Sequence, residues 1–159
     1  KITIPQVYYY TNDAWEDIPA IDDGVTGWPM LMQARYEDGS VWVLTIPDSF
    51  AGLYRLPAGV LNRIRAVAGP DVPVRLEGPA NVSLFVYDNN TFIVESFLDE
   101  PVTVKVVLDA TTGSITDLIT NETIKGQKTP DARIWLREAK DKNAFEMTVK
   151  PHSFRAFKR

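Results

Sequence analysis

The sequence predicts a mainly β protein: an antiparallel β-sandwich of Greek-key or meander type, with one amphipathic helix in its leading part. Two observations lead to this fold class. Short stretches of alternating apolar and polar residues recur at close intervals from residue 71 to the end, as they do in sandwiches. Only residues 57–70 show a helical period, so the helices that alternate with strands in parallel sheets are not expected.

We expect two parts, an α+β leading segment over residues 1–70 and a sandwich domain over residues 71–159. Residues 2–10 alternate loosely and predict a first strand. Residues 11–27 mix Asp, Pro and Gly with isolated apolar residues, which favours a long loop. Two apolar strands then flank Asp38-Gly39, a dipeptide that supplies the positive φ angles of tight hairpins.

The helix follows this hairpin. Pro57 suits a first helical turn, where its missing N–H costs nothing. Apolar residues recur every three to four positions from Val60 to Val67, and Gly69-Pro70 ends the pattern. Arg63 and Arg65 lie on the opposite face, so we expect them to be solvated.

Residues 81–109 give the clearest sheet prediction. Three alternating stretches are separated at Asp88-Asn89-Asn90 and Asp99-Glu100-Pro101, residues that suit turns. We expect one antiparallel meander with an apolar face that another layer covers. Further strands are predicted at residues 72–76, 114–119, 122–125, 133–138, 144–149 and 153–157.

Composition narrows the function classes. The 159 residues carry a net charge of -4 with scattered basic residues, which argues against nucleic-acid binding. No apolar run approaches the roughly 20 residues of a membrane span, so we expect a soluble protein without a membrane partner. The start at Lys1 suggests a fragment of a longer parent, and the compartment stays open between the cytoplasm and secretion.

No catalytic residue is predicted. His152 is the only histidine, and adjacent strand residues such as His152 and Ser153 point to opposite faces. Acidic pairs, which glycoside hydrolysis requires, occur at Glu16-Asp17, Asp22-Asp23 and Asp99-Glu100. All three pairs lie in predicted turns or loops, where acidic residues are common.

No metal site and no cofactor are predicted. Asp22-Asp23-Gly24 and Asp88-Asn89-Asn90 present oxygen ligands but lack calcium-loop spacing. We therefore interpret both as plain turns. The absence of a glycine-rich phosphate loop or dinucleotide fingerprint and of cysteine removes further classes of chemistry.

Aromatic residues near the start raise a binding hypothesis. Tyr8, Tyr10 and Trp15 are close in sequence, and alternation places Tyr8 and Tyr10 on one strand face. Exposed rings of this kind could stack on sugars, although large aromatics more often serve packing. A carbohydrate-binding module that uses these three residues is therefore the alternative function.

The trailing half resembles the C-terminal antiparallel β-domain that follows the catalytic barrel in many bacterial glycoside hydrolases of the amylase and β-galactosidase kind. The similarity rests on NNTFIVESFLDEPVTVKVVL, SITDLITNET and FEMTVKPHSFRAFKR. SITDLITNET resembles the family's Asp-Leu-Leu-Thr-Gly-Glu turn, with Ile119 and Asn121 replacing Leu and Gly. Residues 30–69 resemble the last hairpin and helix of an amidotransferase-like domain found before such a tail.

This resemblance implies a non-catalytic accessory domain of a larger carbohydrate-active protein. In that family the tail carries no catalytic residues, so none is carried over to this chain. The implied partners are the other domains of the parent chain, with a homo-oligomer and a carbohydrate as further expectations.

Overall fold

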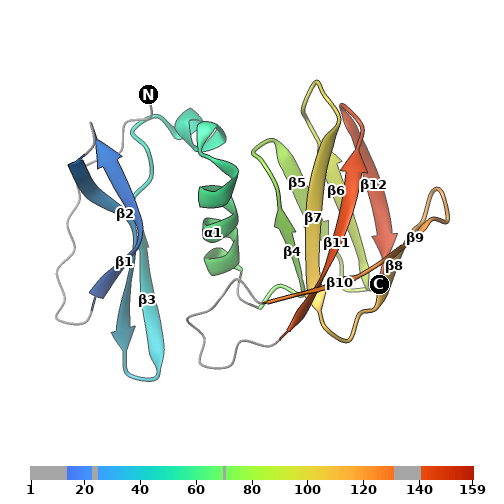
Figure 1. Cartoon of the computed structure of the whole chain (residues 1–159), viewed down its shortest axis with the longest axis horizontal. Coiled ribbons are helices and arrows are strands. Elements are labelled where there is room, and N and C mark those ends of the chain that lie inside the picture. Colours follow the sequence, from blue (N-terminus) through green and yellow to red (C-terminus); the bar gives the residue numbers. More distant parts are fainter. Residues whose placement is uncertain (1–13, 23–24, 70, 131–140) are drawn as a thin grey trace. The chain divides into compact units, whose positions relative to one another are not determined.

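The computed structural model describes residues 14–22, 25–69, 71–130 and 141–159. Contacts divide the chain into two compact units, Lys1–Leu56 and Pro57–Arg159. The first unit holds a small antiparallel sheet, and the second holds a two-layer β-sandwich together with helix α1 (Figure 1). The mainly β, antiparallel fold class predicted from the sequence is confirmed.

The sheet of the first unit consists of β1 (Ala14–Asp22), β2 (Val25–Tyr36) and β3 (Gly39–Leu44), with β2 in the centre. The loop predicted over residues 11–27 is therefore wrong for β1. This strand pairs with β2 through register shifts on both sides of Pro19. Such irregularities let a strand accommodate a proline, which cannot donate to the ladder.

The hairpin predicted around Asp38-Gly39 is confirmed, but its turn lies one residue earlier. Tyr36 pairs with Gly39, so the turn residues are Glu37 and Asp38. Glu37 adopts a φ of 50°, and Gly39 begins β3. The sequence thus predicted the hairpin correctly and assigned the positive φ to the wrong residues.

Helix α1 (Ala58–Ala68) forms where the apolar period predicted it, after the short 3-10 helix η1 (Phe50–Arg55). Pro57 is its N-cap and Gly69 its C-cap. The helix contacts β4 (Val74–Glu77) and belongs with the sandwich in the second unit.

Arg65 corrects the expectation of a solvated polar face on α1. Its Nη1 donates to the Gly78 carbonyl at 2.7 Å, and its Nη2 donates to the Pro79 carbonyl at 3.1 Å. Asn62 Oδ1 accepts a hydrogen bond from the Gly78 amide at 2.9 Å. Burial lowers the pKa of Arg65. These bonds attach the helix to the turn after β4.

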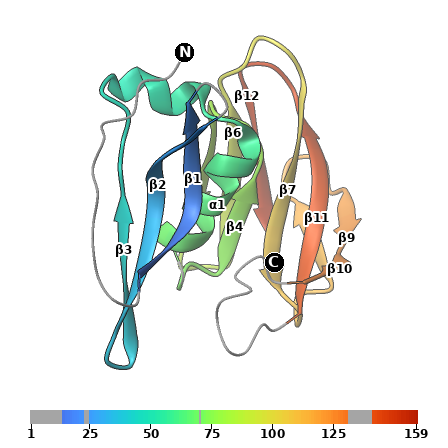
Figure 2. The same ribbon diagram turned by 60° about the vertical axis from the view of Figure 1, so that its left-hand side comes forward.

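The strands of the second unit form two sheets that lie face to face (Figures 1 and 2). The β7 sheet has the order β10 (Gln127–Thr129), β11 (Lys142–Val149), β7 (Val102–Asp109) and β4. The β6 sheet has the order β5 (Val82–Val86), β6 (Thr91–Ser96), β12 (Ser153–Lys158), β8 (Ser114–Asp117) and β9 (Thr123–Lys125).

The three-stranded meander predicted over residues 81–109 is wrong in its pairing. The three strands exist, and β5 and β6 pair as a hairpin, but β7 belongs to the opposite sheet. Both edges of β7 are occupied, by β11 and by β4. Alternation identifies the apolar face of a strand but not the sheet that the strand joins.

Other predicted strands agree with the structure to within a few residues. Residues 74–77, 114–117, 123–125, 142–149 and 153–158 are strands, whereas β10 lies between two predicted strands, where none was expected. The strands predicted at residues 2–10 and 133–138 lie outside the described residues.

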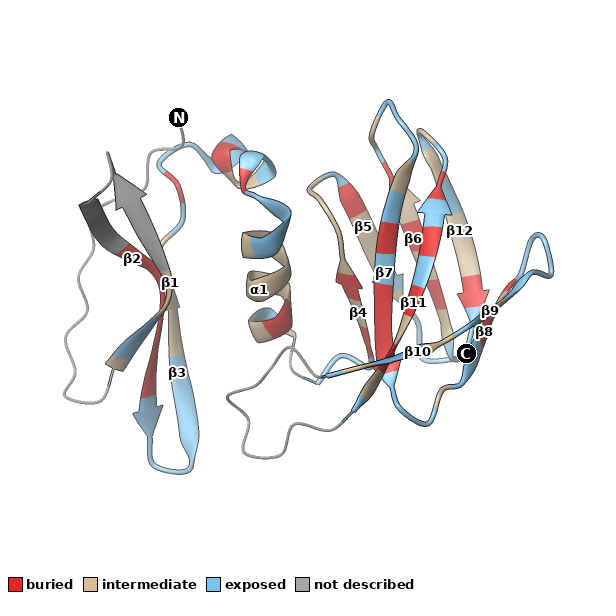
Figure 3. Cartoon of the chain, in the orientation of Figure 1, coloured by how far each residue is buried: buried red, intermediate tan, exposed pale blue. Residues whose placement is uncertain are grey.

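The core lies between the two sheets. Buried residues alternate with less buried ones along β11 and along β7 up to Val106 (Figure 3), as expected for strands with one face inside. Val107 and Leu108 of β7 are both buried as well. Phe92 and Phe157 stack with their ring centroids 5.3 Å apart. The buried apolar cluster contains Val74, Leu76, Val82, Phe92, Val94, Val104, Val106, Leu108, Ile115, Phe145, Met147, Val149 and Phe157.

Asparagines sharpen the turns of the sandwich. Asn81, Asn90 and Asn121 have φ angles of 59°, 64° and 60°, in the left-handed region that asparagine tolerates better than most residues. Asn121 is the position where the resembled turn carries glycine. The φ of 60° at Asn121 explains why asparagine can stand where the resembled turn has glycine, since both asparagine and glycine accept the left-handed conformation.

Candidate functional site

The aromatic residues predicted to bind sugars are only partly described. Tyr8 and Tyr10 lie outside the described residues. Trp15 lies on β1 and is 40% exposed, and the guanidinium of Arg35 is 6.0 Å from the centroid of its ring. This cation–π contact covers part of the ring. The assignment of Tyr8, Tyr10 and Trp15 to a carbohydrate site stays a prediction.

His152 contacts one of the acidic candidates, Asp99, rather than Ser153. His152 Nε2 is 2.8 Å from Asp99 Oδ1, and both side chains are largely exposed. The Ser153 hydroxyl instead donates to the Lys150 carbonyl at 2.8 Å. His152 and Ser153 therefore do not form a nucleophile and base pair in this structure.

The turn at Asp88-Asn89-Asn90 is a plain hairpin turn. Asn89 Oδ1 accepts a hydrogen bond from the Thr91 amide at 3.2 Å, which is how asparagine stabilises turns. Among the described residues, no group of three or more His, Asp or Glu side chains has a metal-binding arrangement. The other predicted turn, Asp22-Asp23-Gly24, includes residues 23–24, which lie outside the described part of the chain.

The most organised polar cluster surrounds Asp117, which the sequence placed only in a family turn. Ile115 and Asp117 are buried and alternate with less buried neighbours on β8, and this pattern directs Asp117 into the sandwich. The side chain is 1% exposed. Asp117 Oδ1 accepts hydrogen bonds from the amides of Ile119 and Thr120 at 2.9 and 3.0 Å.

Arg155 completes this cluster from β12. Its Nε donates to Asp117 Oδ2 at 2.7 Å, and its Nη2 donates to Glu122 Oε2 at 2.5 Å. The guanidinium also lies 5.0 Å from the centroid of the Phe157 ring. One arginine thus connects the first and last residues of the Asp117–Glu122 turn, which closes β8 onto β9.

The cluster shifts the acidity of its members. Burial alone would raise the pKa of Asp117, but hydrogen bonds from the Thr120 amide, the Arg155 side chain and the Ile119 amide outweigh it and lower that pKa. Burial would lower the pKa of Arg155, whereas the hydrogen bonds to Asp117 and Glu122 raise it. Both groups are therefore held in their charged forms.

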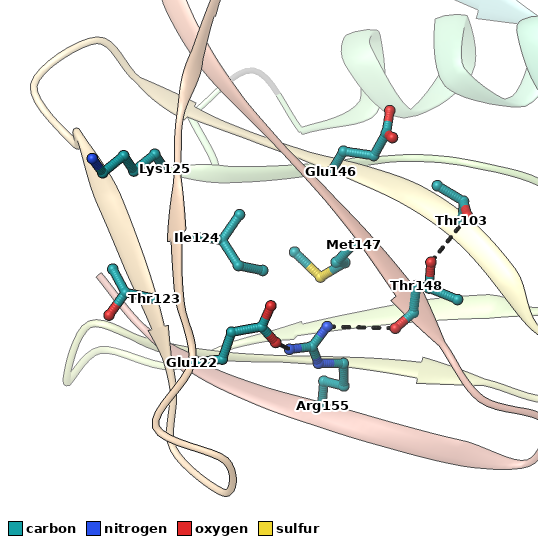
Figure 4. A pocket seen from close by; sticks show the side chains of 9 residues that line it. All are labelled: Thr103, Glu122, Thr123, Ile124, Lys125, Glu146, Met147, Thr148 and Arg155. Carbon is teal, nitrogen blue, oxygen red and sulfur yellow. Dashed lines mark hydrogen bonds and ion pairs between the residues drawn. The ribbon is translucent and has the colours of Figure 1, made fainter.

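A cavity of about 500 Å³ lies beside the Arg155–Glu122 pair. Its lining comes from β7, β9, β11 and β12 and from the turn before β9 (Figure 4). Partly buried Ile124 provides apolar surface, with the core residue Met147 behind it, while Lys125, Glu122 and Arg155 provide charged groups. This combination can contact an apolar surface of a ligand and exchange hydrogen bonds with its polar groups.

Sequence reasoning missed these residues as a site. The available signal was the pattern Asp117-x-x-Thr120-x-Glu122, which was recognised as a turn without a chemical role. The partner of Arg155 could not be read locally, since Asp117 is 38 residues away in sequence. The alternation that places Arg155 and Phe157 on the same strand face could have marked it as a buried cation in need of a carboxylate.

No helix within the described residues is long and apolar enough to cross a membrane. Comparison with known proteins gives one family. A family model described as "Probable glycosyl hydrolase, C-terminal domain" matches residues 73–159, which include both sandwich sheets. No curated protein and no solved structure shows a significant match. Since the matched segment is more than half of the 159 residues, the chain belongs to the family of probable glycosyl hydrolase C-terminal domains.

Proposed function

We propose that this chain is a non-catalytic accessory domain of a larger carbohydrate-active protein, in which it packs against or oligomerises with a neighbouring domain. The observation that carries this proposal is the family match over residues 73–159, whose description is that of a C-terminal domain. The match identifies the family, and the accessory role is our inference from it.

The chemistry of the Asp117 cluster supports a structural role for the family turn. Both carboxylate oxygens of Asp117 accept hydrogen bonds, and the side chain is buried. A general acid or nucleophile must instead reach its substrate. Glu122, the other acid of the motif, bonds to Arg155.

The outer face of the β6 sheet supports packing against a neighbour. The register places Phe85 opposite Ile93 and Ile93 opposite Ala156, and the Leu118 amide bonds to the Ala156 carbonyl. These residues form an apolar row across β5, β6 and β12 that ends at Leu118, the residue after β8. Phe85 and Leu118 at its ends are 44% and 48% exposed, and clusters of exposed apolar side chains are typical of interaction surfaces.

Residues 30–69 bear on the domain that precedes the sandwich in the parent protein. Hairpin β2–β3 and helix α1 follow one another in the order of the resembled amidotransferase-like domain. We propose that residues 30–69 are the end of such a domain and that the parent is a bacterial protein. The sequence that precedes Lys1 in the parent tests both statements directly.

An assay of the purified chain on a panel of aryl glycosides tests the absence of catalysis. We expect no release of the aryl group above that of a buffer control. Hydrolysis that co-purifies with the chain and is lost on substitution of one of its carboxylates would contradict the accessory role.

An association experiment tests the packing role. The double variant Phe85→Ser, Phe154→Ser should weaken binding to the remainder of the parent, supplied as a separate polypeptide, by at least about tenfold because it removes two apolar contacts. Phe50→Ser is the matched control, since Phe50 is also exposed but lies on η1. If the unsubstituted chain, the double variant and Phe50→Ser bind the remainder of the parent equally well, this face is not the interface.

A further inference from the structure

We propose that the cavity beside Arg155 binds a neutral sugar. The first support is the apolar surface inside it. Ile124 extends from β9 and Met147 from β11, and the two side chains point toward one another (Figure 4). Met147 is only 3% exposed and belongs to the core, so the accessible apolar surface is that of Ile124, which is partly buried. The C–H groups on the face of a pyranose ring can pack on this aliphatic side chain, since burial of apolar area is favourable.

The second support is a donor and an acceptor that are held side by side. The guanidinium of Arg155 has five N–H donors, of which Nε and Nη2 bond to Asp117 and Glu122. Nη1 makes only a long contact of 3.5 Å with the Thr148 carbonyl. A ligand oxygen at Nη1 would therefore replace a weak bond with a stronger one.

Glu122 supplies the acceptor of this pair. Its Oε2 receives the hydrogen bond from Arg155, and its other carboxylate oxygen is turned toward Ile124 and Met147 (Figure 4). Two neighbouring hydroxyl groups of a sugar each donate and accept. They can accept from Arg155 and donate to Glu122 at the same time, and the buried contact to Asp117 holds this geometry before a ligand arrives.

Charge balance favours a neutral ligand. The charged residues of the lining are Glu122, Glu146, Lys125 and Arg155, so two acidic side chains stand against two basic ones. Glu146 also lies 3.9 Å from Lys105. An anion drawn to Arg155 would meet Glu122 beside it, and like-charge contacts disfavour such a ligand.

The size of the cavity agrees with a small saccharide. Its volume of about 500 Å³ lies in the range of roughly 300–1,000 Å³ that small-molecule sites occupy. The choice of sugar as the ligand class rests on the proposed function in a carbohydrate-active protein, whereas the polarity and charge of the lining are independent of it.

A titration of the isotope-labelled chain with maltose, cellobiose and lactose, followed by amide NMR, tests the proposal. We expect saturable shifts in the amides of residues 123–125 and 146–148 with at least one sugar. Inorganic phosphate is the charged comparison. Shifts at these amides with phosphate alone, or no shifts with any of the three sugars, would overturn the proposal.

Two variants connect the shifts to the cavity. Glu122→Gln should weaken sugar binding by about tenfold, the typical effect of losing one hydrogen bond to a charged group, because one acceptor oxygen becomes a donor. Glu95→Gln, a change of the same kind on the outer face of β6, should bind as the parent chain does. Equal affinity in both variants would contradict the assignment.

Ile124→Ala is the second variant, and it removes apolar surface without changing charge. It should also weaken binding, while amide spectra without sugar report that the sandwich remains folded. Sugar binding to the isolated chain requires no neighbouring domain. Failure of this inference is therefore distinct from failure of the proposed function, which would be seen as aryl glycoside hydrolysis.

Discussion

The two sheets of the sandwich use the same inward pattern but differ on their outer faces. The β7 sheet carries polar pairs outside, among them Lys105 with Glu146 and Thr103 with Thr148. The β6 sheet carries Phe85, Leu118 and Phe154 outside, all exposed. The residues on a sheet face that is exposed to water are normally polar. The difference supports the proposal that the β6 sheet packs against a neighbouring domain.

The sheets also differ in how they hold an ion pair. Arg155 and Asp117 of the β6 sheet are joined inside the sandwich, where the side chain of Asp117 is 1% exposed. Lys105 and Glu146 of the β7 sheet are joined on the outside, with side chains that are more than half exposed. Buried and exposed pairs have very different energetic consequences when one partner is removed.

The largest expected effect comes from removing the buried carboxylate. Asp117→Ala leaves Arg155 and two turn amides without their acceptor and should lower the free energy of unfolding by about 3–5 kcal/mol. Glu146→Ala on the outer face should change it by at most about 1 kcal/mol. Urea unfolding measures both. Similar losses in the two variants would remove the distinction between the pairs.

A smaller effect is expected where the chain passes from the β6 sheet to the β7 sheet. A Cβ atom at Gly126 would lie 2.8 Å from Phe145 Cζ and 2.9 Å from Asn143 Cβ, so something must shift. Gly126→Ala should cost about 1–3 kcal/mol of stability. Gly113→Ala is the matched control, because a Cβ there meets open space. Thermal unfolding of the two variants should separate them clearly.

Acid should weaken the β6 sheet through Asp117. Its pKa in the folded state is lowered, below the value of about 3.9 expected when unfolded. The stabilisation that ionised Asp117 gives to the folded state is therefore present above about pH 4, and it is lost as the pH falls through the pKa of Asp117 in the folded state. Asp117→Asn should flatten the dependence of unfolding free energy on pH in this window. An unchanged slope in Asp117→Asn would assign the acid sensitivity to other carboxylates.

The smallest effect on stability is expected on the apolar outer face. Phe85→Ser should change the free energy of unfolding by no more than about 0.5 kcal/mol, since the ring is substantially exposed. Phe92→Ala, one strand away but directed inward against Phe157, should cost about 3–5 kcal/mol. Chemical unfolding checks this contrast, and a large loss in Phe85→Ser would show that the outer ring serves the domain's own stability.

Local patterns predicted much of the fold. Alternation located β5, β6, β7, β11 and β12, and the period between Val60 and Val67 located α1. Strand β1 escaped prediction because its Asp and Pro residues are typical of loops, and pairing with β2 overrides that preference. The sugar prediction for Tyr8, Tyr10 and Trp15 stays open, and the Arg155 cavity was not predicted at all.

The sequence by itself determined where most strands and turns of the sandwich form, because side-chain alternation and the conformational tolerance of Asn81, Asn90 and Asn121 act over a few residues. Only the tertiary structure decided that β7 leaves the β5–β6 hairpin for the opposite sheet. It also decided that Arg155 meets Asp117 across 38 residues of sequence. These outcomes depend on long-range packing and on satisfying buried charge, which no local pattern encodes.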